Sequence, residues 1–88
     1  MITLLMSLRD LKAEQYGKPF TAITVGTAAR DIQDMIGGGD KNNMLVSHPA
    51  DFDLYHIGNF DDEAGEITAH QPTHRILNCG SLVQKDKP

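Results

Sequence analysis

Residues 48–67 constrain the fold of this chain most, because their pattern is that of one complete β-hairpin. Residues 52–60 hold aromatic and branched side chains, which favour an extended strand. An acidic turn containing Gly65 follows, and a returning strand begins at Glu66 or Ile67. Glycine readily adopts the positive φ angle that such turns need. The pattern specifies the shape of this half of the chain and shows no chemistry.

The residues before the hairpin predict two strands and one helix. Residues 2–8 form a first strand, and residues 20–25 form a second extended segment. The polar residues 9–17 between them suit a short helical turn. Thr27 is a natural N-cap for a helix over residues 28–36, which the glycines at 37–39 end. We therefore expect an α+β fold, a small antiparallel sheet of about four strands in the order β-β-α-β-β, with the helix packed on one face.

The length of 88 residues limits the chain to one domain. We expect residues 1–84 to form it and the polar residues 85–88 to be a disordered tail. A chain of this size buries only about 60 to 65% of its unfolded surface. Pairing of strand edges, or burial of the open sheet face, would complete the core in a homodimer. The apolar opening residues 1–6 are too short for a membrane span or a signal peptide.

Charge is distributed unevenly along the chain. The net charge is −4, with eight basic residues, and affinity for a phosphate backbone comes mainly from such residues. Five of the eight lie in the N-terminal half, whereas the hairpin is acidic and contains neither lysine nor arginine. This polarity leaves room for a basic face. The candidate nucleic-acid-binding residues are Arg9, Lys12, Lys18 and Arg30.

Metal, cofactor and catalytic signatures are weak. The four histidines and Cys79 lack the CxxC or HExxH spacing of zinc sites, so we assign the histidines to surfaces and turns. The triple glycine follows the helix instead of preceding it, which favours a C-cap over a phosphate loop. Ser47 beside His48 is not a triad, because sequence neighbours on an extended chain point to opposite faces. We expect no enzymatic activity, no metal and no cofactor, and a lone Cys79 thiol that is buried or half-buried.

The five aromatic residues divide into two groups. Phe20, Phe52 and Phe60 are the obvious core material of a small chain without tryptophan. Tyr16 and Tyr55 remain open between core and surface, because a phenol tolerates partial exposure. Exposed rings on a sheet are able to stack on single-stranded bases.

The hairpin sequence HPADFDLYHIGNFDDEAGEI, the element Tyr16-Gly17-Lys18-Pro19-Phe20 and the helix between them resemble the small nonstructural protein of gokushoviruses. These are tailless phages of the microvirus group with circular single-stranded DNA genomes. The resemblance covers roughly residues 1–70. It implies a protein made in the cytoplasm of the infected bacterium, commonly described as DNA-binding and thought to act in the synthesis or packaging of single-stranded DNA.

A second hypothesis comes from a different class of protein. The chain is also of a size to be an interaction module that binds a viral replication protein, a capsid protein or a host factor through a sheet edge or the acidic hairpin. Basic residues gathered on one surface would favour DNA as the partner. An exposed apolar patch or a long unpaired strand would favour a protein partner.

Overall fold

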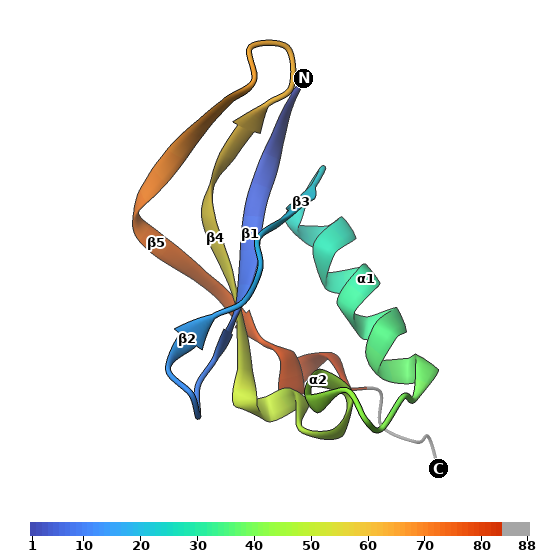
Figure 1. Ribbon diagram of the computed structural model, residues 1–88. Coiled ribbons are helices and arrows are strands. Elements are labelled where there is room, and N and C mark those ends of the chain that lie inside the picture. The colour runs from blue at the N-terminus through green and yellow to red at the C-terminus, as the bar shows by residue number, and fades with distance from the viewer. Residues whose placement is uncertain (84–88) are drawn as a thin grey trace.

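The structure is a computed structural model and describes residues 1–83 of the chain. It contains five strands, two α-helices and two short 3-10 helices (Figure 1). The strands are β1 (Ile2–Asp10), β2 (Gln15–Tyr16), β3 (Phe20–Ala22), β4 (Phe52–Asp61) and β5 (Glu66–Asn78). The helices are α1 (Val25–Gly38), α2 (Met44–Ser47), η1 (Pro49–Asp51) and η2 (Cys79–Leu82). The expected tail at residues 85–88, and residue 84, lie outside the described residues.

A single antiparallel sheet is built around β1, which confirms the α+β class. The strand order is β2-β1-β4-β5, and β3 also pairs with β1. β4 pairs with β1 along its whole length, while β3 pairs at Leu4–Met6 and β2 at Arg9–Asp10. The helical turn expected within residues 9–17 is wrong, because this segment forms the β1–β2 hairpin. Asp10 closes the hairpin by accepting hydrogen bonds from the backbone N–H groups of Lys12 and Ala13 at 2.9 and 3.1 Å.

The core lies between one face of this sheet and α1, with η2 and α2 at one end (Figure 1). Met6 and Leu54 of the sheet are fully buried, and Ala28 and Ile32 of α1 are nearly so. Cys79 is also fully buried, as the sequence predicted. These side chains are removed from water together, and that burial is the main force holding the helix on the sheet.

The ends of α1 differ from the prediction. The helix covers Val25–Gly38, so it begins before residue 28 and shortens the expected strand 20–25 to Phe20–Ala22. Its N-cap is Thr24, whose side chain accepts a hydrogen bond from the backbone N–H of Thr27 at 3.1 Å. Thr27 is therefore not the N-cap. It lies three residues after the N-cap and donates its backbone N–H to the capping side chain, which is the usual capping geometry. At the other end only Gly39, with φ of 80°, leaves the helical conformation.

The β4–β5 hairpin extends beyond α1, with its turn beside the N-terminus at one end of the molecule (Figure 1). β5 continues to Asn78 through a region in which the sequence showed no pattern. Gly58 allows the two strands to approach closely there, since a Cβ on it would lie 2.4 Å from the carbonyl oxygen of Thr68. The register between β4 and β5 is therefore incompatible with any side chain at this position.

Candidate nucleic-acid interface

The sheet face opposite α1 carries a different set of side chains from the core face. Met6, Leu8 and Leu54 contact the core, and side chains alternate along a strand, so their neighbours project to the opposite side. The register pairs Arg9 with Asp53 and Ser7 with Tyr55 on that side. We call this second surface the open face.

On the open face, Tyr16 contacts both Tyr55 and Arg9. The rings of Tyr16 and Tyr55 meet edge to face, with centroids 5.2 Å apart and an interplanar angle of 78°. The guanidinium carbon of Arg9 lies 5.6 Å from the centre of the Tyr16 ring. Tyr16 is 47% exposed, so part of its ring remains accessible. We call these residues, with Arg75, the arginine–tyrosine cluster.

Arg75 joins the cluster from β5, where it pairs with Tyr55 in the register. Its Nε donates a hydrogen bond of 2.9 Å to Asp53, and Asn78 Nδ2 donates another of 2.8 Å to the same carboxylate. Burial raises the pKa of Asp53, but these hydrogen bonds and the positive charges of Arg75 and Arg9 outweigh it, so the pKa is lowered overall. The Arg75 side chain is 54% exposed, which leaves guanidinium donors facing solvent.

The predicted DNA-binding residues do not all lie together. Arg9 is in the cluster, Lys12 is in the turn that follows β1, and Lys18 is in the loop that follows β2, so all three belong to one end of the sheet. Arg30 is exposed on α1, which packs on the other face. Arg75 was missed, because the sequence showed no strand pattern at residues 71–88.

The open face changes character along its length. Past the cluster it becomes apolar, with Leu5 opposite Gly58 and Thr3 opposite Phe60, which in turn pairs with Ile67. We call Leu5, Phe60 and Ile67 the apolar centre; Ile67 is 66% exposed. The assignment of Phe60 to the core is therefore wrong, whereas Phe20 and Phe52 do pack against the core.

Beyond the apolar centre lies the turn between β4 and β5. It carries four acidic residues, which we call the acidic tip: Asp61, Asp62, Glu63 and Glu66. The Asp62 carboxylate lies 2.7 Å from the N-terminal ammonium of Met1, and Glu63 lies 3.4 Å from it. Asp61 and Glu66 pair with each other one position beyond Phe60 and Ile67, so alternation turns them toward the α1 side, and Asp62 and Glu63 are the acids of the turn itself. The open face therefore runs from a cluster containing arginines, over an apolar middle, to an acidic turn.

Three of the four histidines gather on the strands. The rings of His56 and His70 are 4.8 Å apart, and those of His70 and His74 are 6.1 Å apart. His70 and His74 are exposed, as expected for surface residues, and His56 is half-buried. Among residues 1–83, no three histidine, cysteine or carboxylate side chains are placed to hold a metal ion.

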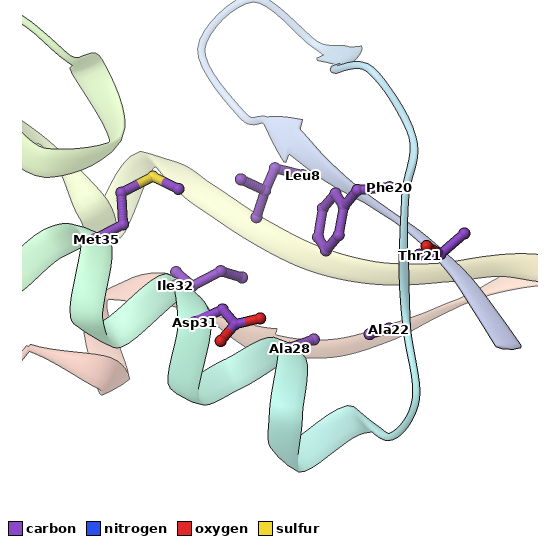
Figure 2. Close-up of a pocket in the computed structure, with 8 residues that line it drawn as sticks. All are labelled: Leu8, Phe20, Thr21, Ala22, Ala28, Asp31, Ile32 and Met35. Atoms are coloured by element: carbon purple, nitrogen blue, oxygen red, sulfur yellow. The ribbon is translucent and has the colours of Figure 1, made fainter.

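A separate apolar groove of about 350 Å³ lies between α1 and the strands β1 and β3 (Figure 2). Leu8 and Phe20 line it from the strand side, and Ile32 and Met35 line it from the helix. Asp31 is the charged residue in the lining, and Met35 is 50% exposed. The groove suits an apolar group and has a single carboxylate beside it.

Comparison with known proteins identifies the origin of the chain and leaves its role open. No curated protein and no solved structure matches it. Within residues 1–83, no helix combines the length and apolar character needed to cross a membrane. A family model described as "Phage ORF5 protein" matches residues 3–82, which includes every strand from β2 to β5 and both α-helices. The chain therefore belongs to the phage ORF5 protein family and is a bacteriophage protein.

Proposed function

We propose that this protein binds single-stranded DNA through the arginine–tyrosine cluster, as an accessory factor in viral DNA synthesis or packaging. It would do so as a nonstructural protein of a gokushovirus, in the cytoplasm of the infected bacterium. The observation that carries the proposal is the contact of Arg9 with Tyr16 and of Tyr16 with Tyr55 on a sheet face that α1 leaves uncovered. The proposed role is binding, without a catalytic step.

The cluster combines the two kinds of contact that single strands need. An accessible tyrosine ring stacks on an unpaired base, and each such contact contributes about 1 to 3 kcal/mol. Arg9 and Arg75 supply positive charge beside the rings, and Lys12 and Lys18 lie at the same end of the sheet. Bases in a duplex are already stacked, so a flat platform of this kind favours single strands over double strands.

The net charge of −4 is compatible with this site, because the acidic residues are partly segregated. Asp62 lies beside Met1, eight residues along the chain from Arg9. At about 3.3 Å per residue, the acidic tip is about 26 Å from the cluster. Physiological salt screens exposed charges over about 8 Å, so the tip repels a phosphate at the cluster only weakly.

Fluorescence anisotropy with labelled oligonucleotides tests the proposal. Single-stranded and double-stranded DNA are titrated at about 50 and 200 mM salt, the range in which phosphate contacts reveal themselves. We expect salt-sensitive binding that is tighter for the single strand. Absence of binding to both at 50 mM salt would refute the proposal.

Two matched substitutions separate the cluster from general charge. Arg9→Gln should weaken binding and flatten the salt dependence by about 0.7 in log–log slope, the value for one phosphate contact with a single strand. Arg30→Gln removes the same charge from α1 and should leave the affinity unchanged. Tyr16→Ala should weaken binding about 5- to 150-fold with an unaltered slope, because stacking is not ionic. Equal losses in the two arginine variants would contradict the assignment.

The apolar groove favours a second candidate function, a protein-interaction module. An apolar side chain of a viral replication protein, a capsid protein or a host factor would enter between Phe20 and Met35, with a neighbouring cation facing Asp31. β5 also offers a long edge, because β4 is its one strand partner among the described residues. Calorimetric titration with the purified viral proteins tests this alternative, and Met35→Glu should abolish the binding.

A further inference from the structure

We propose that two copies of this chain pair through their open faces in a two-fold dimer, with the acidic tip of each copy over the arginine–tyrosine cluster of the other. Three observations support this pairing: an uncovered apolar centre, opposite charge character at its two ends, and equal spacing of those ends from the middle. The pairing rests on observations other than those behind DNA binding and is measured without DNA, but it covers the arginine–tyrosine cluster, so a second copy and single-stranded DNA would compete for that surface.

The apolar centre is the part that needs a cover. Ile67 is 66% exposed on β5, and Phe60 and Leu5 beside it are half-buried and lie outside the core. No helix of the described residues packs on this side, since α1 and η2 contact the opposite face. A second sheet stacked about 10 Å away would remove these side chains from water, as in sandwiches of two sheets.

Charge selects the orientation of the second copy. From residue 42 to residue 74 the chain contains neither lysine nor arginine, so the cation beside the acidic tip is the Met1 ammonium, one positive charge against four carboxylates. The opposite end of the open face carries Arg9 and Arg75, with Lys12 in the adjoining turn. Asp53 at that end is already paired with Arg75. An antiparallel arrangement brings the acidic tip to the arginines, whereas a parallel arrangement brings tip against tip.

The spacing of these groups fits a two-fold axis through the row of Leu5, Gly58 and Ala69. Asp62 donates its backbone N–H to Met1, four residues before Leu5, and Arg9 is four residues after Leu5. Each therefore lies about 13 Å from the axis along β1. Rotation by 180° about such an axis exchanges the two ends, so each tip meets a cluster and both contacts form at once.

Sedimentation equilibrium of the full chain over about 10 μM to 1 mM, at about 50 and 500 mM salt, measures the pairing. We expect a monomer–dimer equilibrium that salt weakens, because its end contacts are ionic. Ile67→Lys should raise the dimer dissociation constant at least about tenfold by placing an unpaired charge in the apolar centre. Ile23→Lys is the matched control, because Ile23 is 62% exposed but lies in the β3–α1 connection, and it should leave the constant unchanged.

The salt dependence of the wild type tests the orientation, because parallel copies would repel tip to tip and salt would strengthen their pairing. A charge exchange then tests the ionic end contacts themselves. The variant D62K/E63K presents a basic tip to a basic cluster, and the variant R9E/K12E presents an acidic tip to an acidic end. Each should be monomeric alone, and an equimolar mixture should associate, because every end contact is again between opposite charges. Circular dichroism establishes that each variant is folded. A monomeric wild type at 1 mM, equal effects of the two isoleucine variants, or folded charge variants that do not associate on mixing would each overturn the proposal.

Discussion

Replacing Asp53 by asparagine should destabilise the protein by about 2 kcal/mol at neutral pH. The side chain is nearly buried, with 5% of the residue exposed, and it accepts hydrogen bonds from Arg75 and Asn78. A hydrogen bond to a charged group contributes about 1.5 to 3 kcal/mol. Asparagine keeps one accepting oxygen but turns an N–H group toward one of these donors, so about one such bond is lost. For a domain of this size the midpoint of thermal unfolding should fall by about 8 to 16 °C.

The effect depends on pH in a direction that the lowered pKa of Asp53 determines. A carboxylate whose pKa is lower in the folded state stabilises fully above its unfolded pKa, about 3.9, and loses that contribution as pH falls through the folded pKa. The stability gap between wild type and Asp53→Asn should therefore be constant from about pH 5 to 7 and close below about pH 4.

Urea unfolding followed by circular dichroism, repeated from pH 7 down to about pH 2.5, measures this gap directly. The matched control is Asp51→Asn, a half-buried aspartate whose side chain accepts no hydrogen bond within residues 1–83. We expect the control to stay within about 0.5 kcal/mol of wild type. A gap for Asp53→Asn that matches the control, or that persists unchanged at pH 2.5, would refute the reasoning.

Three further predictions concern the fold. Gly58→Ala should cost about 1 to 3 kcal/mol, because its Cβ meets a β5 carbonyl, whereas Gly37→Ala, with open space around it, should be neutral or stabilising; equal urea midpoints would contradict this. Thr24→Ala should lower the free energy of unfolding by about 1 kcal/mol through loss of the N-cap, and Thr27→Ala should lower it less. If Thr27→Ala melted at the lower temperature, Thr27 and not Thr24 would be the N-cap. Burial raises the pKa of Cys79 to about 11, so a thiol reagent at pH 8 should label it only when urea unfolds the chain; rapid labelling without urea would exclude the buried position.

Local signals in the sequence were sufficient for the hairpin and the helix. Residues 52–60 carry strand-forming side chains on both sides, and Gly65 indeed adopts a positive φ, of 68°. β5 was underestimated because its second half contains Pro72, His74 and other residues of low strand propensity. The second half of β5 stays extended because it pairs with β4. This pairing joins residues that are distant in sequence, so the local sequence does not predict it.

The candidate site was predictable only in part. Arg9, Tyr16 and Tyr55 could be named as candidates from the sequence, although the sequence did not decide whether the two tyrosines are buried. The contacts of Tyr16 with Arg9 and Tyr55 depend on the register of β1 with β2 and β4. Arg75 reaches Asp53 across a register shift between Leu54 and Tyr55, and no one-dimensional pattern encodes such a shift. Arg30 lies on α1, which packs on one face of the sheet, whereas Arg9 projects from the other face. This difference is a property of the tertiary structure.

The absence of lysine and arginine from residues 42–74 also determines how proteases divide this chain. Trypsin cleaves after lysine and arginine, and between Lys41 and Arg75 it finds neither. A complete digest therefore releases α2, all of β4, the acidic tip and most of β5 as one peptide. Peptide mapping will record any modification or cross-link on the hairpin in a single fragment, and any proteolytic protection of the open face must be read from Arg9, Lys12 and Arg75 at its other end.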